Sequence, residues 1–435
     1  MFGYYLELGF RSLRRNPMLT ALMVVAIGFG VAASMVTYSV FRVVSGDPIP
    51  QKSARLFTPL IDNWGPQYNT DGQPKNALSY TDASALLQAR KAQHQTMFYG
   101  IDVSVSPQDV QALPFDAQGY ATSADFFGMF EVPFLYGGPW QNSDDDNHAA
   151  VAVISQAMND KLFGGTDSVG RDIVLDTHAY RIVGVMRKWN PVPRFYDLFS
   201  SRAFADPVQV YVSYNRALDL HTATTGYACG SVDDGTNWNS WLHGECVWMK
   251  VWVELDGPRQ VADYRRFLTA YAALQRQQGR FHWAPNVRLY DVKTYLDINQ
   301  VVPPETSVSL LVSVGFFVIC IVNTIGLLLA KFMRRSAEIA VRRALGASHF
   351  AIYCQYLVEA GAVGLAGGLL GLILTYIGMS GLGLLFKPEI ARLAHVDVVL
   401  IGLTFAVAIA ATVVAAFYPT WRASRVQPAW QLKTN

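Results

Sequence analysis

Four long stretches of apolar residues without a charged side chain stand out along the chain. They span residues 18–41, 306–330, 360–386 and 398–421. A helix needs about 20 apolar residues to cross the hydrocarbon core of a bilayer, and each stretch is long enough to do so with some tilt. A buried helix in a large soluble core explains one such stretch but hardly four. We therefore predict four membrane-spanning helices.

The positions of these stretches predict one helix, a long insertion and then three more helices. In chain order, the predicted segments are an N-terminal amphipathic helix (1–17), helix 1 (18–45), an inserted domain (46–305), helix 2 (306–330), a connecting loop (331–350), helix 3 (351–386), a short loop (387–397), helix 4 (398–421) and a C-terminal tail (422–435). The first apolar stretch is about twice as long as the core of a secretory signal peptide, so we expect an uncleaved anchor. Before it, apolar residues and three Arg occupy opposite faces, which is typical of a helix on the membrane surface.

Charge sets the expected orientation of these helices. Only 16% of the residues are charged, and the inserted domain carries an excess of acidic side chains whereas the rest carries an excess of basic ones. Short basic segments stay in the cytoplasm, so we place both termini and residues 331–350 there and the inserted domain on the opposite side. The net charge of +2 is too small to indicate nucleic-acid binding.

Within the inserted domain, strand and helix patterns alternate, which predicts α+β packing. The clearest elements are a buried strand (149–154), a short helix (156–163), a hairpin (171–176 with 180–186, turning at 177–179), a second strand (246–255) and an amphipathic helix (261–278). Along the second strand, Val247, Met249, Val251 and Val253 are expected on one face, and Trp248, Lys250 and Trp252 on the other. Residues 189–244 are irregular and are expected to form long loops.

Three further features of this domain have competing interpretations. Trp238, Trp241, Trp248 and Trp252 suit either a recognition surface or a small core, and we favour the core. Asp144–Asp146 suits a solvated loop better than a cation site. Cys229 and Cys246 suit a disulfide in an oxidising compartment. A metal site with His243 is the alternative, but it lacks a clear fourth ligand. Cys320 and Cys354, in or near the helices, are expected to act as apolar filling.

No catalytic pattern is present in the sequence. It contains no G-x-x-x-x-G-K-[ST] phosphate loop, no H-E-x-x-H zinc motif and no G-x-S-x-G nucleophile motif. We therefore expect no catalytic residues, no metal site and no cofactor bound by this chain.

The predicted loop 331–350 is more informative. Two basic pairs flank Glu338, apolar residues lie between them, and Gly346 stands where a helix should end. Ordinary positive-inside charge explains the Arg residues but not this ordered pattern. The sequence therefore predicts a short basic helix between two membrane spans.

This loop carries a resemblance to a known family. The run R-R-x-x-E-I-A-V-R-R-A-L-G-A-S over 334–348 resembles the cytoplasmic loop of MacB-, LolC/LolE- and FtsX-like ABC transporter permeases. Four other pieces resemble the same family in matching order: R-S-L-R-R-N-P (11–17), A-V-A-V-I-S to Y-R-I-V-G-V-M (150–186), Gln355 and Glu359 with the Gly-rich run 361–371, and Y-P-T-W-R-A-S-R-V-Q-P-A (418–429). Residues 50–110 and 190–245 show little resemblance.

The resemblance implies a fold and a set of functional residues. It implies a periplasmic domain of two lobes, one split over 50–115 and 245–300 and the other inserted over 116–244. Together with the four predicted helices, the resemblance implies an α-helical integral membrane protein of the bacterial inner membrane with a large α+β periplasmic domain. The residues that would dock on an ATPase are Arg334, Arg335, Glu338, Arg342, Arg343 and Gly346. The residues that would allow close helix packing are Gly364, Gly367, Gly368 and Gly371.

Partners and mechanism are implied in the same way. The resemblance implies a dimer of separate ABC ATPase subunits that bind ATP and Mg²⁺, and a second permease chain, identical or related. A membrane fusion protein and a TolC-like channel are compatible with it. The family works by mechanotransmission, in which ATP-driven movement of the helices displaces the periplasmic domain and expels a substrate. An FtsX-like regulator, a membrane sensor and an anchored hydrolase are the rival functions. The sensor requires an output domain and the hydrolase a nucleophile, and the sequence shows neither.

Overall fold

The computed structural model describes residues 17–69, 72–107, 113–200, 203–230, 237–302, 304–381 and 396–424. The chain divides into two compact units, of which residues 46–301 form one and the segments on either side form the other. The predicted amphipathic helix before residue 17, most of the predicted loop 387–397 and the tail after residue 424 lie outside the described residues.

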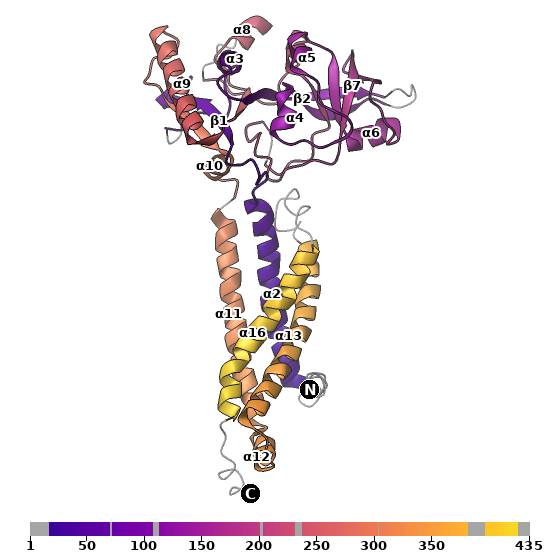
Figure 1. Ribbon diagram of the computed structural model, residues 1–435, viewed down its shortest axis with the longest axis vertical. Coiled ribbons are helices and arrows are strands. Elements are labelled where there is room, and N and C mark those ends of the chain that lie inside the picture. The colour runs from indigo at the N-terminus through magenta and orange to yellow at the C-terminus, as the bar shows by residue number, and fades with distance from the viewer. Residues whose placement is uncertain are drawn as a thin grey trace. The chain divides into compact units, whose positions relative to one another are not determined.

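The unit formed by the segments before residue 46 and after residue 301 consists of long apolar helices. They are α2 (Pro17–Ser45), α11 (Pro304–Met333), α13 (His349–Ser380) and α16 (Val398–Ser424). Each is long and apolar enough to cross a membrane, so the prediction of four such helices is confirmed for the described part of the chain. Within this unit α2 packs against α11 and α13, and α13 packs against α16 (Figure 1).

Two helix ends differ from the sequence prediction. Helix α11 continues to Met333, so Lys331 lies in its last turn rather than in a loop. Helix α13 begins directly after Ser348, whose hydroxyl accepts a hydrogen bond from the backbone N of Ala351 at 3.1 Å. Such a cap satisfies a backbone donor at the start of a helix. Both changes shorten the connection between the two helices.

The unit of residues 46–301 is built around one mixed sheet (Figure 1). Its described strands are β1 (Leu56–Ile61), β2 (His94–Ser106), β3 (Phe115–Thr122), β4 (Phe134–Gly137), β5 (Val151–Ser155), β6 (Asp172–Leu175), β7 (His178–Met186), β8 (Val210–Ser213), β9 (Lys250–Glu254) and β10 (Val287–Asp291). They form a 10-stranded sheet in the order β10-β1-β9-β2-β3-β8-β5-β7-β4, and β6 pairs with β2 and β7. The β3–β8 and β5–β7 pairs are parallel.

Helices cover both faces of this sheet. The described helices are η1 (Pro66–Tyr68), α3 (Tyr80–Ala89), α4 (Asp125–Met129), α5 (Asn142–Asp146), α6 (Gln156–Phe163), α7 (Tyr214–Asp219), α8 (Trp238–Leu242), α9 (Gly257–Gln277) and α10 (Val292–Ile298). One core contains side chains of α3, α6, α7 and α9, and the other contains side chains of α4 and α10. Successive residues of a strand point to opposite faces, so Met97 and Tyr99 join the first core and Phe98 the second.

The local elements predicted between residues 149 and 186 are confirmed. The strand is present as β5, and α6 has the predicted bounds. The hairpin is present as β6 and β7. Its turn is tighter than predicted, because β7 already begins at His178. Asp176 adopts φ 54° there, a conformation that Asp tolerates better than most residues.

The expectation of long loops over 189–244 was wrong at the centre of the sheet. The buried strand β8 lies there, between β3 and β5. Its four residues are too few to produce a strong pattern in the sequence. Both of its neighbours come from distant parts of the chain, and pairing with them stabilises the strand.

The Trp residues belong to the core, as favoured. Trp248 and Trp252 are buried, and Trp238 and Trp241 pack partly buried against the first core. Trp248 differs from the prediction because it joins the same core as Met249. The backbone N–H groups of Trp248 and Met249 both donate to the carbonyl O of Leu78, each at 3.0 Å. In a β-bulge, two residues of one strand lie opposite one residue of the neighbouring strand. The bulge interrupts the alternation of side chains between the two faces of the sheet.

The prediction of a solvated loop at Asp144–Asp146 was wrong for its central residue. Asp145 belongs to α5 and is buried. Its carboxylate accepts hydrogen bonds from Ala124 N at 2.7 Å, Trp140 Nε1 at 3.0 Å and Ser213 Oγ at 2.7 Å. Burial raises its pKa to about 6 despite these hydrogen bonds. Asp145 therefore links α5 to the start of α4 and the end of β8.

A buried ion pair lies beside the second core. Lys250 Nζ is 3.6 Å from Asp197 Oδ1, and both side chains are almost fully buried. Tyr120 donates to Asp197 Oδ2 at 2.7 Å, and the backbone N of Ser200 donates to Oδ1 at 2.9 Å. Burial lowers the pKa of Lys250. Burial alone would raise the pKa of Asp197, but Lys250 and the hydrogen bonds lower it. The pair fixes the segment after Trp189 to β9.

Candidate coupling site

The connection between α11 and α13 contains the short helix α12 (Ser336–Ala344). It ends at Ala344, and Gly346 follows the C-cap Leu345, where the prediction places the stop. Gly346 adopts φ 98°, a conformation that only glycine adopts at little cost. Leu345 N donates to Val341 O and Ala347 N donates to Arg342 O, each at 3.0 Å, which closes the last turn. Helix α12 is therefore a defined element with fixed ends.

Polar side chains hold α12 against α13. Arg342 Nη2 is 2.6 Å from Glu338 Oε1, one turn away on the same helix. Arg342 Nη1 donates to Gln355 Oε1 of α13 at 3.1 Å. On its apolar side Ala340 is buried, and Ile339 is buried in a core shared with α11, α13 and α16. A movement of α12 therefore displaces α13 with it.

A buried ion pair joins α11 to α13 at the same end of the bundle. Lys331 Nζ is 2.6 Å from Glu359 Oε1, and their side chains are 0% and 2% exposed. Arg335 Nη1 lies 3.4 Å from Glu359 Oε2, and Lys331 Nζ lies 3.5 Å from Thr20 Oγ1 of α2. Ionisable groups are rare in membrane helices because each is costly without a partner. This cluster ties α2, α11 and α13 to one point.

The six residues predicted to dock on an ATPase fall into two groups. Arg335, Glu338 and Arg342 make the contacts within the unit described above, and Arg343 is partly buried. Arg334 and Gly346 are exposed, beside the exposed apolar side chains of Val341, Leu345 and Phe350. Docking itself stays a prediction for all six residues.

Sequence reasoning gave Lys331 no individual role, and it used Gln355 and Glu359 only as part of the family resemblance. A signal was present, because Glu359 is the single acidic residue between 351 and 386. Its partner lies 28 residues earlier in the chain, so only the packing of two helices identifies it.

Comparisons with known proteins support a family assignment. The sequence profile of the MacB-like periplasmic core domain matches residues 20–269, which is more than half of the chain. The profile of the FtsX-like permease C-terminal region matches residues 310–428. The chain belongs to the family of MacB-like permeases. The FtsX-like match contains α12, Lys331 and Glu359, so the candidate site lies in the permease region of the family.

Two relatives and one solved structure illustrate the likeness. The pyoverdine export ATP-binding/permease protein PvdT of Pseudomonas savastanoi is 26% identical over 416 residues, which cover 95% of this chain and 57% of PvdT. The macrolide export ATP-binding/permease protein MacB of Burkholderia cenocepacia is 26% identical over 308 residues, which cover 70% of this chain and 39% of that protein. The periplasmic region of MacB from Actinobacillus actinomycetemcomitans aligns with 57% of this chain and 94% of its own, at 15% identity and a TM-score of 0.37. This MacB-like chain spans less than two thirds of the length of the two relatives.

The four predicted packing glycines of this MacB-like permease lie on two faces of α13. A Cβ atom on Gly364 would lie 2.9 Å from Ile409 Cα and one on Gly368 would lie 2.9 Å from Phe405 Cδ1, both in α16. A Cβ atom on Gly367 would lie 2.8 Å from Ile27 Cγ2, and one on Gly371 would lie 3.3 Å from the carbonyl O of Gly28 in α2. One pair therefore faces α16 and the other faces α2.

We expect Gly364→Val to separate α13 from α16. The added side chain meets backbone atoms of α16, and such overpacking costs about 1–3 kcal/mol of unfolding free energy. Gly361→Val is the matched control, because a Cβ atom there meets nothing within 4 Å. Both free energies can be measured by denaturant titration of the purified chain in detergent. Equal losses in the two variants would show that α13 and α16 do not pack closely at Gly364.

The two predicted half-cystines are bonded in the MacB-like periplasmic domain. A disulfide joins Cys229 and Cys246, which are 17 residues apart. A bonded cysteine cannot supply a thiolate, so the alternative metal site with His243 finds no support among the described residues. Glu245, next to this disulfide, accepts hydrogen bonds at its carbonyl O from Trp64 Nε1 at 2.7 Å and Asn63 Nδ2 at 2.9 Å.

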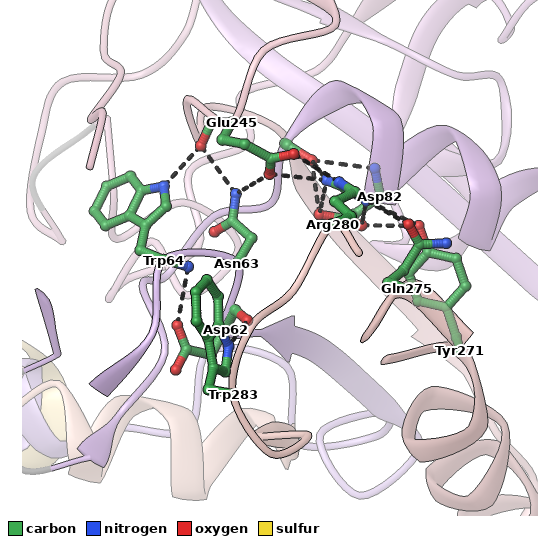
Figure 2. A network of polar contacts seen from close by, with 10 residues as sticks. Asp62, Asn63, Trp64, Asp82, Glu245, Tyr271, Gln275, Arg280 and Trp283 are labelled. Atoms are coloured by element: carbon green, nitrogen blue, oxygen red, sulfur yellow. Dashed lines mark hydrogen bonds and ion pairs between the residues drawn. The ribbon is translucent and has the colours of Figure 1, made fainter. Parts of the chain in front are cut away.

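Arg280 connects the disulfide segment, which is the chain around Glu245 and Cys246, to α3 (Figure 2). Its Nη1 and Nη2 lie 2.6 and 2.9 Å from the two carboxylate oxygens of Asp82, and its Nε lies 2.6 Å from Glu245 Oε1. Tyr271 of α9 also donates to Asp82, at 2.8 Å. Burial alone would lower the pKa of Arg280, but the hydrogen bonds with Glu245 and Asp82 raise it. One guanidinium therefore fixes α3, α9 and the disulfide segment.

Proposed function

We propose that this protein is the permease subunit of an ABC exporter of the bacterial inner membrane. The observation that carries the proposal is α12, a short helix whose polar contact with α13 lies beside the buried Lys331–Glu359 pair, in a chain of the MacB-like family. The names of PvdT and of MacB from Burkholderia cenocepacia combine ATP binding with export, and this chain resembles their permease part. The permease itself carries out no catalysis.

The proposed topology is one helix, the periplasmic domain and then three helices. Helix α2 precedes residues 46–301, and α11, α13 and α16 follow them. The basic residues at the chain ends and around α12 support a cytoplasmic position for those segments. Within the periplasmic domain we propose the two lobes, 50–115 with 245–300 and 116–244.

The proposed mechanism is mechanotransmission. Closure of an ATPase dimer pushes α12, which moves with α13 through Arg342 and Gln355. Lys331 and Glu359 pass the movement to α11 and towards α2. These two helices are joined through the chain to both ends of residues 46–301, so their displacement moves the periplasmic domain. The domain then expels a substrate that is already outside the cytoplasm.

The proposed partners follow from the family. An ABC ATPase dimer binds ATP and Mg²⁺ and docks on the exposed side of α12. A second permease chain completes the pair. Its contact with α11 would cover exposed apolar side chains such as Leu311, Val312 and Ile319. A membrane fusion protein and a TolC-like channel would carry the substrate, an antibiotic, peptide or lipoprotein, out of the cell.

A pull-down from native membranes, followed by mass spectrometry, tests the ATPase partner. We expect an ABC ATPase to co-purify with the wild-type chain. Leu345 is 83% exposed, so Leu345→Glu leaves the fold intact but buries an unpaired carboxylate in the contact. Recovery should fall at least about tenfold, which corresponds to about 1.4 kcal/mol. Leu274→Glu, at an exposed Leu of α9, is the matched control and should leave recovery unchanged.

The double variant Glu338→Lys with Arg342→Glu tests the charge pattern separately. The two reversed side chains can still pair across one helical turn, so α12 is retained while its charges are inverted. We expect the ATPase to be lost. Unchanged recovery in both α12 variants would place the docking site elsewhere. An intact wild-type membrane complex without any ATPase would contradict the permease proposal and favour a regulator.

A further inference from the structure

The pairing of β2 is interrupted on the side that faces away from β3. Strand β9 pairs with β2 as far as Phe98, and β6 pairs with it again from Val105. Phe98 and Val105 also pair with β3, so β9 and β6 both lie on the other side of β2. No described strand pairs with β2 between these two residues on that side. The sheet is therefore interrupted over residues 99–104.

The interruption leaves the backbone of Asp102 without a neighbouring strand among those described. Thr225 N donates to Gly100 O at 2.9 Å. Asp176 N, directly after β6, donates to Ser104 O at 2.7 Å. Alternate residues of an antiparallel strand direct their N–H and C=O groups to the same side. Asp102 lies midway between Gly100 and Ser104, so its backbone N–H and C=O point into the gap.

A hollow of about 290 Å³ lies beside Asp102. Ligand sites of proteins typically begin at about 300 Å³, so this hollow suits a small molecule. Its lining includes buried apolar side chains on three strands, which are Ile101 and Val103 of β2, Leu175 of β6 and Val212 of β8. The segment 220–223 after α7 also lines it. The hollow therefore combines an apolar wall with two backbone polar groups.

The ring of His221 is a fixed part of this lining. His221 adopts φ 55° after the end of α7, and Thr222 N donates to Ala217 O at 2.9 Å, which holds the turn. The imidazole stacks on Trp238 with ring centres 4.8 Å apart. Trp238 in turn lies 5.1 Å from Trp241, and both pack against the first core. A planar ligand can therefore pack against an imidazole that is already held in place.

The surroundings of the hollow favour an uncharged ligand. The described lining contains no Lys or Arg, which disfavours an anion. The Asp102 side chain is exposed and belongs to the opposite face of β2, and the Asp176 carboxylate accepts a hydrogen bond from Ser104 N at 2.9 Å. Burial raises the pKa of Tyr180 in the lining, whereas Arg216 lowers it and Asp176 raises it. Charges of both signs therefore act near the Tyr180 hydroxyl.

We propose that this hollow binds a small, uncharged heteroaromatic lactam, a planar ring in which an N–H and a C=O group are adjacent. The lactam edge pairs with the backbone N–H and C=O of Asp102, as a neighbouring strand would. The ring packs between His221 and the apolar wall. This inference concerns a ligand of residues 46–301 and does not depend on the proposed export function.

Equilibrium dialysis of quinolin-2-one against the full-length chain in nanodiscs tests the proposal. Empty nanodiscs of the same lipids measure the partition of the probe into lipid, which is subtracted. We expect a dissociation constant below about 1 mM. N-methylquinolin-2-one should bind about tenfold more weakly, because the Asp102 carbonyl then loses its donor. Equal affinity for the two probes would contradict the backbone pairing.

A matched pair of variants locates the binding. Ala223→Trp fills the hollow, and Ala262→Trp adds the same side chain at an exposed position of α9 outside the lining. Ala223→Trp should abolish binding of quinolin-2-one, and Ala262→Trp should preserve it. Equal binding by both variants, or no binding by the wild-type chain, overturns the proposal. If the wild-type chain recovers an ATPase but does not bind the probe, the permease proposal stands and this one fails.

Two substitutions of His221 test the stacking. His221→Ala removes the ring and should weaken binding of quinolin-2-one about fivefold, whereas His221→Phe keeps a ring and should restore most of the affinity. If His221→Ala bound the probe as tightly as the wild-type chain, the ring of His221 would not form part of the site.

Discussion

Replacing Glu359 by Gln is expected to destabilise the helical unit by about 3–5 kcal/mol, because it leaves a buried charge without its partner. The charge is the ammonium group of Lys331, which lies 2.6 Å from the Glu359 carboxylate and has an exposed fraction of 0%. A neutral amide can accept one hydrogen bond from it but cannot balance its charge. Denaturant titration of the purified full-length chain in detergent measures this loss.

A double-mutant cycle separates the contribution of the ion pair to the unfolding free energy from the effect of changing the size of the side chains. Lys331→Met combined with Glu359→Gln removes both charges, so its unfolding free energy should lie closer to that of the wild type than that of Glu359→Gln alone. Glu359 also contacts Arg335 at the start of α12, so hydrogen exchange over residues 336–344 should quicken in Glu359→Gln. A loss below about 1 kcal/mol would place the pair among weak surface ion pairs and contradict its role as a link between helices.

Replacing Arg280 by Met is expected to destabilise the periplasmic domain by a similar amount, about 3–5 kcal/mol. Asp82 is fully buried and would lose the cation that contacts both of its carboxylate oxygens. Its remaining hydrogen bonds from Ser79 and Tyr271 are made by neutral donors. Tryptophan fluorescence during denaturant titration should report the change, since Trp64 and Trp283 lie in the network of Figure 2.

Two further variants show whether the stabilisation by Arg280 depends on the geometry of its guanidinium group or on its charge alone. Arg280→Lys keeps the positive charge but cannot reproduce the paired contacts of the guanidinium, so an intermediate loss is expected. Arg276→Met changes an exposed Arg of α9 and should have little effect. If Arg280→Met destabilised the chain no more than Arg276→Met, the network in Figure 2 would not hold α3 to the disulfide segment.

Local patterns were sufficient to predict much of the fold. A bilayer requires about 20 consecutive apolar residues from each spanning helix, so α2, α11, α13 and α16 are visible in the sequence. The bounds of α6 and the end of α12 just before Gly346 follow from signals within a few residues. The hairpin of β6 and β7 does too, since its strands are adjacent along the chain.

These local patterns could not predict the contacts between segments that lie far apart in the sequence. Strand β8 has four residues, and its place between β3 and β5 depends on strands that lie far away in the sequence. The bulge at Trp248 depends on its contact with Leu78. The burial of Asp145 depends on donors from Ala124, Trp140 and Ser213. In each case the residue type allows several environments, and the packing of distant elements selects one.

The membrane helices, the basic helix α12 and the likeness to MacB-like permeases could all be predicted from the sequence, because each depends on residues close together in the chain. The tertiary structure alone brought Lys331 to Glu359 and Arg280 to Asp82 and Glu245. An ion pair forms wherever its two side chains meet in space. That meeting is decided when helices and strands pack, and no local pattern records it.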